Sequence, residues 1–310
     1  KEVIAELAAN DGLKLDEAGF TACWEEHQRV STSKGVEVWK ASALQDAKPR
    51  LGATRFTGYD QLTAPCQVAL IEVDGKECAA APPGTAVRFA LDASPFYAES
   101  GGQVGDTGTV EGDGWAIAVS DVQKDDGLFV HIGTVVRGTA RPGPATARVD
   151  AERRRDTTRH HSATHLLHAA LGRFVGAHVE QQGSKVSAEE LRFDVNNPKA
   201  IEPAQLQQVE AWVNQQIAAK RAVAIRELPI DEARKLGAKA MFGEKYGAVV
   251  RVVSMGEAQP VSVEFCGGCH VGNTADIGAF RITGEGASAA GIRRITAVAG
   301  RAAQARSEER

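Results

Sequence analysis

Two short motifs carry histidine and cysteine side chains that could bind one metal ion together. His161 and His165 lie four positions apart in a stretch with a helical pattern. At this spacing two side chains share one helix face, about 5–6 Å apart at Cβ, which lets both imidazoles reach the same ion. The second motif is CGGCH, from Cys266 to His270, in which two glycines permit a tight reversal between a thiol and an imidazole.

The chemistry of these side chains favours zinc. Thiolate and imidazole are softer ligands than the carboxylates that hold magnesium or calcium, and together they select zinc among the common divalent ions. We therefore predict one Zn²⁺ ion bound by His161, His165, Cys266 and His270. His160 is a neighbouring candidate, but the four-residue spacing selects His161.

Other roles remain open for the second motif. C-x-x-C-H is also the attachment signature of a c-type haem, but the chain has no recognisable export signal and only two methionines as further axial ligands. A structural zinc site is the stronger alternative, because four protein ligands close a tetrahedral site whereas a catalytic zinc keeps one position open. The thiol of Cys269 either competes for the metal or is a small buried side chain, and its position next to His270 favours the second role.

Length and composition indicate a globular protein. The chain has 310 residues, of which 43% are hydrophobic and 25% charged, enough for two or three modest cores. No apolar run approaches the roughly 18 residues of a membrane span and no signal-peptide pattern opens the chain, so we expect a cytoplasmic protein without membrane contact. The sequence begins with Lys1 rather than Met, which favours a piece of a longer protein.

Charge and cysteine content narrow the function classes further. A net charge of -4 argues against a protein that coats nucleic acid by bulk attraction, but it leaves room for a local basic patch. The five cysteines are an odd number in a chain without an export signal. We therefore expect reduced thiols or metal ligands rather than a disulfide framework.

The first half of the chain predicts helices and then a barrel. Residues 1–35 have a helical pattern, because Phe20, Cys23, Trp24 and His27 follow one helical stripe. Between residues 51 and 151 short β-branched runs alternate with Asp-Gly pairs at 74–75, 113–114 and 126–127, which predicts a small β-barrel with tight hairpin turns. The glycine-rich stretch FYAESGGQVGDTG, residues 96–108, is either a ligand-binding loop or a plain hairpin loop.

Helical patterns return after Asp150. We predict one helix capped by Asp156 or Thr157 and ending near Gly176, and a second helix from Pro203. Residues 222–228 and 261–265 are predicted strands. The predicted fold is α+β, with a helical segment (1–48), a small β-barrel subdomain (49–151), an α+β domain with a mixed or antiparallel sheet and the metal site (152–300), and the start of a C-terminal linker helix (301–310).

Six segments together resemble the editing domain of alanyl-tRNA synthetases. They are HSATHLLHAAL (161–171), FYAESGGQVGDTG (96–108), LRFD (191–194), FGEKYG (242–247), CGGCH (266–270) and DIGAFRI (276–282), in matching order and spacing. Free-standing AlaX proteins and the editing domain of threonyl-tRNA synthetases share the paired HxxxH and CxxxH motifs. Residues 15–31 and 291–300 resemble the flanks of this domain in the synthetase, which favours a synthetase fragment, with the end of its tRNA-binding region at residues 1–48, over an AlaX protein.

The resemblance implies a metal-dependent hydrolase that proofreads mischarged tRNA(Ala). Such an enzyme cleaves the ester that joins serine or glycine to the acceptor end, because a site shaped for a methyl group cannot exclude glycine and rejects an added hydroxyl poorly. The implied metal ligands are the four residues named above, and zinc would either activate a water molecule or orient the aminoacyl group. The implied catalytic-pocket residues, whose polar groups would bond the serine hydroxyl that alanine lacks, are Thr164, Gln181 and Ser184.

The implied partners are the acceptor end of tRNA(Ala) and the remaining domains of a full-length synthetase. Three residues of the glycine-rich stretch are expected near the substrate and its terminal adenosine: Gly101, Gly102 and Gln103. Four basic residues are expected to contact acceptor-end phosphates or else to be solvated surface residues: Arg192, Lys245, Arg293 and Arg294. A rival function is a non-catalytic tRNA-binding module held together by structural zinc.

Overall fold

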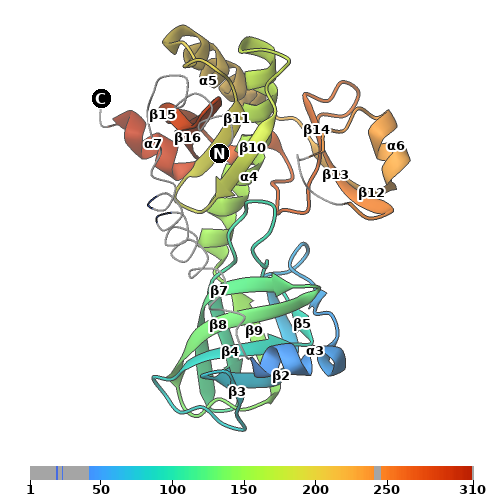
Figure 1. Ribbon diagram of the computed structural model, residues 1–310, viewed down its shortest axis with the longest axis vertical. Coiled ribbons are helices and arrows are strands. Elements are labelled where there is room, and N and C mark those ends of the chain that lie inside the picture. The colour runs from blue at the N-terminus through green and yellow to red at the C-terminus, as the bar shows by residue number, and fades with distance from the viewer. Residues whose placement is uncertain (1–18, 20–22, 24–41, 241–245, 309–310) are drawn as a thin grey trace.

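The computed structural model describes residues 42–240 and 246–308, together with Gly19 and Cys23 (Figure 1). Of the predicted N-terminal helix, Phe20, Trp24 and His27 lie outside the described residues. The described part combines a β-barrel with helices and two further antiparallel sheets, which confirms the predicted α+β class. Among the described residues, no helix is long and apolar enough to cross a membrane.

The barrel is a closed ring of six antiparallel strands. Its order is β2-β4-β8-β7-β6-β9, and β9 pairs back onto β2. The six strands of the ring are β2 (Thr63–Val73), β4 (Ala86–Leu91), β6 (Gly108–Gly112), β7 (Trp115–Asp125), β8 (Leu128–Arg137) and β9 (Gly143–Val149). Three short strands flank them: β1 (Arg55–Phe56), β3 (Lys76–Glu77) and β5 (Ala93–Ser94). The three Asp-Gly pairs fall at the turns of hairpins β2/β3, β6/β7 and β7/β8, as predicted.

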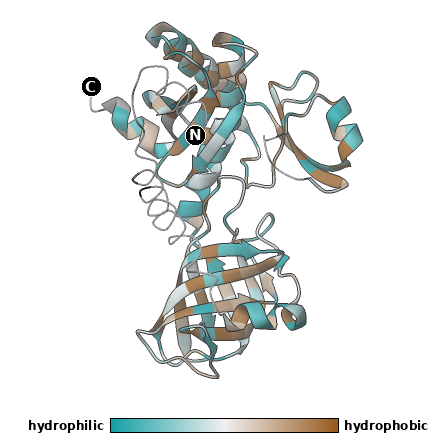
Figure 2. Ribbon diagram, in the orientation of Figure 1, coloured by the Kyte–Doolittle hydropathy of each residue, from teal (hydrophilic) through white to brown (hydrophobic). Residues whose placement is uncertain are grey.

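Alternation of apolar and polar residues explains why these strands close into a barrel. The first six residues of β2 alternate strictly between exposed and buried, and the hydropathy colours alternate along the barrel strands in Figure 2. The inward side chains form one core that includes Phe89, Phe96 and Ile117. Helix α3 (Ala43–Leu51) covers part of the outside, where Leu44 packs with Leu70 and Val130.

The imidazole of His131 is fully buried in the barrel. Its Nε2 lies 2.8 Å from Oγ of Ser94, and its ring stacks on Phe89. Burial lowers the pKa of His131 to about 4, from about 6.5 in an unfolded chain. The folded barrel therefore holds a neutral imidazole where the unfolded chain takes up a proton.

This burial predicts acid sensitivity. The pKa of His131 is lower in the folded protein than in the unfolded chain, so protonation favours the unfolded chain. The free energy of unfolding should therefore be fully retained above pH 6.5 and should fall as the pH approaches 4. The total loss should be about 3 kcal/mol. His131→Gln keeps a polar partner for Ser94 but cannot titrate. Denaturant unfolding between pH 7.5 and 4 should therefore give a flatter pH profile for the variant, and identical profiles would refute the assignment.

The long helix α4 (Ala151–Phe174) starts the second half of the structure and runs from the barrel up between the other two larger sheets (Figure 1). Its N-cap is Asp150, whose carboxylate accepts the backbone amides of Glu152 and Arg153. The predicted cap at Asp156 or Thr157 is therefore wrong by six or seven residues. From His160 to His168 every residue is buried, so the helix is enclosed on all sides.

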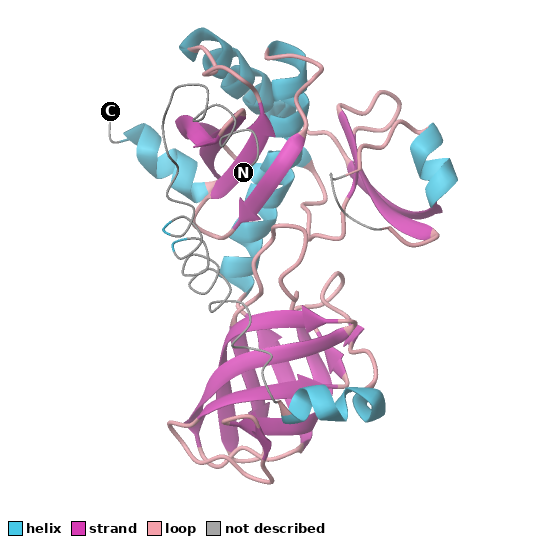
Figure 3. Ribbon diagram, viewed as in Figure 1, coloured by secondary structure: helices cyan, strands magenta, loops and turns pink. Residues whose placement is uncertain are grey.

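Two antiparallel sheets flank α4, rather than the single mixed or antiparallel sheet predicted (Figure 3). One sheet has the order β10-β11-β16-β15 and the other the order β12-β13-β14. Helix α5 begins at Pro203 as predicted and packs on α4 through Val209 and Val213. The elements are β10 (Gln181–Val186), β11 (Leu191–Asn196), α5 (Pro203–Ala218), β12 (Val223–Pro229), α6 (Ile230–Lys235), β13 (Val249–Met255), β14 (Ser262–Phe265), η2 (Thr274–Ile277), β15 (Phe280–Ala289), β16 (Ile292–Ala299) and α7 (Arg301–Glu308).

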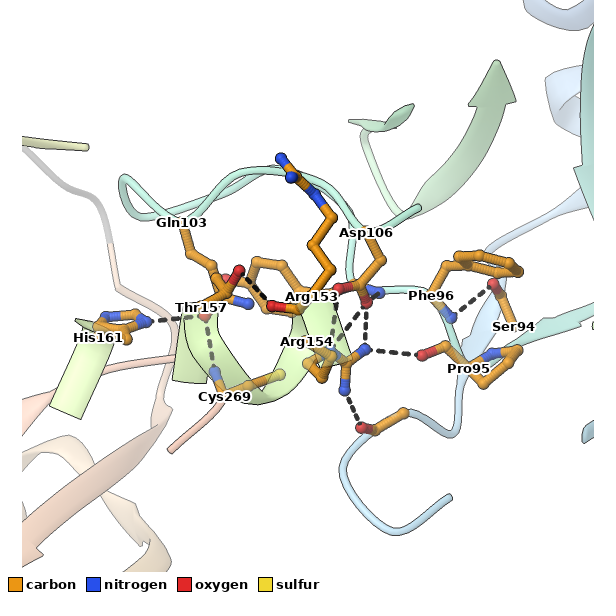
Figure 4. A network of polar contacts seen from close by, with 12 residues as sticks. Ser94, Pro95, Phe96, Gln103, Asp106, Arg153, Arg154, Thr157, His161 and Cys269 are labelled. Atoms are coloured by element: carbon orange, nitrogen blue, oxygen red, sulfur yellow. Dashed lines mark hydrogen bonds and ion pairs between the residues drawn. The ribbon is translucent and has the colours of Figure 1, made fainter. Parts of the chain in front are cut away.

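A buried ion pair joins the barrel region to α4. The guanidinium of Arg154, on the first turn of α4, contacts both carboxylate oxygens of Asp106 and also donates to the carbonyls of Gly58 (2.7 Å) and Pro95 (2.9 Å) (Figure 4). The side chains of Arg154 and Asp106 are 6% and 5% exposed. One arginine thus fixes two loops of the barrel region against the helix that carries the histidines.

Candidate metal centre

The four predicted metal ligands come together in one cluster. His161 and His165 project from α4, while Cys266 and His270 lie on the loop that follows β14. One possible ligand atom from each of the four residues lies within 4.8 Å of the other three. Gly268 allows this packing, because a Cβ at that position would collide with the His161 ring.

The distances within the cluster suit a shared tetrahedral ion. Sγ of Cys266 lies 3.4 Å from Nε2 of His161 and 3.2 Å from Nε2 of His270. A thiolate and an imidazole that share one tetrahedral zinc ion lie about 3.5 Å apart. The donor set and its spacing therefore fit a metal ion.

Burial controls the charge of these ligands. It lowers the pKa of His161 to about 3, and it lowers the pKa values of His165 and His270 as well. The imidazoles are therefore neutral and offer lone pairs at neutral pH. Burial raises the pKa of the Cys266 thiol to about 12, so an incoming ion must displace its proton.

Two of the three imidazoles have a hydrogen-bond partner at Nδ1. Nδ1 of His161 lies 2.7 Å from Oε1 of Gln103, and Nδ1 of His270 lies 3.1 Å from Oγ of Ser162. Nδ1 of His165 lies 3.6 Å from the carboxylate of Glu264, beyond hydrogen-bond distance, and makes no hydrogen bond with the described residues. Partners of this kind orient metal-binding histidines and select the tautomer with a free Nε2.

Glu264 is a site residue that the sequence reasoning missed. It lies on β14 and is 8% exposed, with Nδ1 of His168 at 3.2 Å and the Ser262 hydroxyl at 3.0 Å. Burial alone raises the pKa of this carboxyl, but His165 and the hydrogen bonds from His168 and Ser262 outweigh burial and lower it to about 2. An acidic residue two positions before Cys266, between two apolar residues of a predicted strand, was the available signal.

Two cavities within the described residues border the cluster. The larger, of about 560 Å³, is lined by His270 and Cys269 together with Tyr59 and Arg251. The smaller, of about 240 Å³, is lined by Cys266, Gly101 and Arg251 among others. The sequence reasoning found neither Tyr59 nor Arg251.

Tyr59 and Arg251 line the larger cavity, and both contact the CGGCH loop. The Arg251 guanidinium lies 4.2 Å from the ring centre of Tyr59 and donates to the carbonyls of Cys266 and Gly268, each at 2.8 Å. The Tyr59 hydroxyl donates to the Gly267 carbonyl at 2.6 Å, yet the residue remains 48% exposed. This contact fixes an exposed aromatic ring at the cavity.

The predicted pocket residues lie on two elements. Thr164 is buried on α4, and its hydroxyl donates to the His160 carbonyl at 2.8 Å. Gln181 and Ser184 are half-buried on β10. Gly102, which has a φ of +82°, packs so closely on Ser184 that an added Cβ would lie 2.6 Å from its carbonyl oxygen. The glycine-rich loop therefore lies against the strand that carries two of the predicted pocket residues.

Three of the four predicted phosphate contacts, Arg192, Arg293 and Arg294, lie on the four-stranded sheet and are ion-paired. Arg293 contacts Glu285 through two nitrogens at 2.6 and 2.8 Å. Arg294 contacts Asp194 through two nitrogens, each at 2.8 Å. Arg192 is paired with a neighbouring glutamate, Glu190, at 2.7 Å, and Lys245 lies outside the described residues.

The remaining histidine and cysteine candidates lie outside the cluster. Nε2 of His160 accepts the backbone amide of Ala299 at 2.9 Å, so His160 ties α4 to the end of β16. Cys269 is 6% exposed, and the four-residue cluster does not include it. The side chain of Cys269 is thus a small buried group, as expected.

Comparisons with known proteins match both halves of the chain. The family described as "tRNA synthetases class II (A)" matches residues 1–153, and "Threonyl and Alanyl tRNA synthetase second additional domain" matches residues 250–296. The chain is 46% identical to the alanine–tRNA ligase of Herpetosiphon aurantiacus over 96% of its length, and 44% identical to that of Thermus thermophilus over the same share. Over the full length of the chain, it is 43% identical to the alanine–tRNA ligase of Microcystis aeruginosa. In each comparison the chain spans 35% of the relative.

Proposed function

The chain belongs to the alanyl-tRNA synthetase family, and we propose that its histidine and cysteine cluster is a hydrolytic editing site that removes serine or glycine from mischarged tRNA(Ala). The observation that carries the proposal is the convergence of three neutral imidazoles and one thiol beside a cavity. By analogy with the relatives, this activity would operate within an alanine–tRNA ligase. The partners would then be the acceptor end of tRNA(Ala) and the other domains of that enzyme.

The residues of the chain have distinct tasks in this proposal. His161, His165, Cys266 and His270 hold one zinc ion, which when bound supplies Lewis acidity for polarising an ester carbonyl or a water molecule. Gln103 and Ser162 orient the imidazoles of His161 and His270 through Nδ1, and the Glu264 carboxylate lies 3.6 Å from Nδ1 of His165. Burial keeps bulk water from competing for the ligand atoms.

The larger cavity is suited to the 3′-terminal nucleoside that carries the amino acid. It reaches His270, so an ester placed there lies next to the cluster. The exposed ring of Tyr59 offers a stacking surface for a base, a contact that contributes about 1–3 kcal/mol in single-stranded nucleic acid complexes. Gly101 lines the smaller cavity, on the side of Cys266.

The direct test is to incubate the purified chain with seryl-, glycyl- and alanyl-tRNA(Ala). We expect zinc-dependent release of serine and glycine and much slower release of alanine. Equal rates for all three would contradict editing. Tight tRNA binding without any release would favour the rival function, a tRNA-binding module whose four ligands close a structural zinc site.

Selectivity for serine provides a further prediction. Thr164→Val and Gln181→Leu each remove a polar group proposed to bond the serine hydroxyl, at a cost of about 1–1.5 kcal/mol in the seryl transition state. The ratio of seryl to alanyl deacylation rates should therefore fall about tenfold. Thr157→Val is the matched control, because Thr157 also lies buried on α4 and donates to the carbonyl four residues before it. An unchanged ratio in Thr164→Val would remove Thr164 from the pocket.

A further inference from the structure

Gln103 connects the glycine-rich loop of the barrel region to the metal cluster. The side chain is fully buried, and its Oε1 lies 2.7 Å from Nδ1 of His161 and 2.9 Å from the backbone nitrogen of Cys269 (Figure 4). One amide oxygen thus contacts both α4 and the CGGCH loop. Gln103 lies 58 residues before His161 in sequence, on the segment that joins β5 to β6.

These contacts fix the tautomer of His161. The backbone N–H of Cys269 can only donate, so the Gln103 atom facing it must be the oxygen. The same oxygen can only accept from His161, so Nδ1 carries the ring proton. Nε2 then has the lone pair, and it is Nε2 that lies 3.4 Å from Sγ of Cys266 at the cluster.

The surroundings of the loop support a positioning role. Gly102, with a φ of +82°, brings the backbone against Ser184, so the chain can turn Gln103 inward only without a side chain at that position. The backbone of the next residue, Val104, pairs with Val186 of β10. The loop is therefore fixed on the domain that carries the ligands, and Gln103 is held at a defined distance from His161.

We propose that Gln103 is a positioning residue that sets the zinc affinity of the cluster by holding His161 with Nδ1 protonated and Nε2 free. The inference rests on the proposed metal site and adds a contribution from the barrel region to it. Loss of such an outer partner weakens metal binding about 10- to 100-fold in proteins. Zinc affinity should therefore depend on a residue that does not touch the ion.

The test is zinc affinity by chelator competition, without tRNA, for Gln103→Leu, Gln103→Asn and Gln103→Glu. Leucine has no acceptor and asparagine is one methylene too short, so both should bind zinc about 10- to 100-fold more weakly. Glutamate keeps an oxygen that can accept from both His161 and the backbone of Cys269, so the zinc affinity of Gln103→Glu should remain within about tenfold of wild type. Nitrogen-15 spectra of the histidines should show protonated Nδ1 on His161 in wild type and Gln103→Glu, and a tautomer mixture in the other two variants.

The outcomes separate this inference from the proposed function. Equal zinc affinity in wild type and Gln103→Leu would overturn the role of Gln103 and leave the metal site intact. Equal losses of zinc affinity in Gln103→Leu and Gln103→Glu would indicate an effect of packing rather than of hydrogen bonding, and would also overturn the positioning role of Gln103. Failure of the wild-type chain to bind zinc would contradict both proposals, whereas zinc binding without deacylation would contradict the editing function alone.

Discussion

Replacement of Cys266 by alanine should abolish stoichiometric zinc binding and reduce serine release from seryl-tRNA(Ala) at least about 100-fold. Cys266 is the only thiol in the cluster, and its Sγ lies within 3.4 Å of both His161 and His270. Removal of an outer partner already weakens metal binding about 10- to 100-fold, so loss of a direct ligand should have the larger effect. The measurements are zinc content after dialysis and the initial rate of deacylation.

Cys78→Ala is the matched control for this variant. Cys78 is a free, partly exposed cysteine that hydrogen-bonds locally to the Lys76 carbonyl and takes no part in the cluster. It should retain one zinc ion per chain and the wild-type rate. A folded Cys266→Ala protein with full zinc content and activity would contradict the assignment of Cys266 as a ligand.

Replacement of Arg154 by methionine should destabilise the protein by about 3–5 kcal/mol. The change keeps much of the side-chain volume but leaves the buried carboxylate of Asp106 without its charged partner. Breaking one half of a buried ion pair costs this much because the remaining charge stays out of water. It also removes the hydrogen bonds to Gly58 and Pro95, so the barrel loops lose their attachment to α4. Denaturant unfolding measures the change in free energy.

The neighbouring residue provides the control. Arg153 pairs with Glu189, but these side chains are 34% and 63% exposed, so Arg153→Met should cost less than about 1 kcal/mol. Comparable losses in the two variants would show that burial of the Arg154 pair is not what stabilises the junction. Arg154→Lys should recover only part of the lost stability, because an ammonium cannot reproduce the planar set of donors.

Local sequence patterns were sufficient to predict the convergence of the four histidine and cysteine residues and the presence of the barrel. The four-residue histidine spacing and the CGGCH motif each constrain a short segment, and their chemistry is complementary. The Asp-Gly pairs fixed the hairpin turns in the same way, and Asp74 and Asp126 adopt positive φ angles of 49° and 47° there. Features encoded within a few consecutive residues could therefore be predicted.

Features that depend on tertiary contacts could not be predicted from the sequence. The start of α4 was missed because the charged first turns resemble a solvated segment, whereas Arg154 and Thr157 are buried against the barrel region. The ion pair of Arg294 with Asp194 follows from strand register, since these residues lie opposite each other on β16 and β11. The contact of Gln103 with His161 likewise depends on docking of two distant segments.

The most direct test of a zinc-dependent editing site is the rate at which the chain releases serine from seryl-tRNA(Ala) after removal and readdition of zinc. The convergence of His161, His165, Cys266 and His270 predicts that chelation abolishes release and that one equivalent of zinc per chain restores it. Circular dichroism at each step verifies that the protein remains folded. Full serine release by the folded, zinc-free chain would contradict zinc-dependent editing at this cluster.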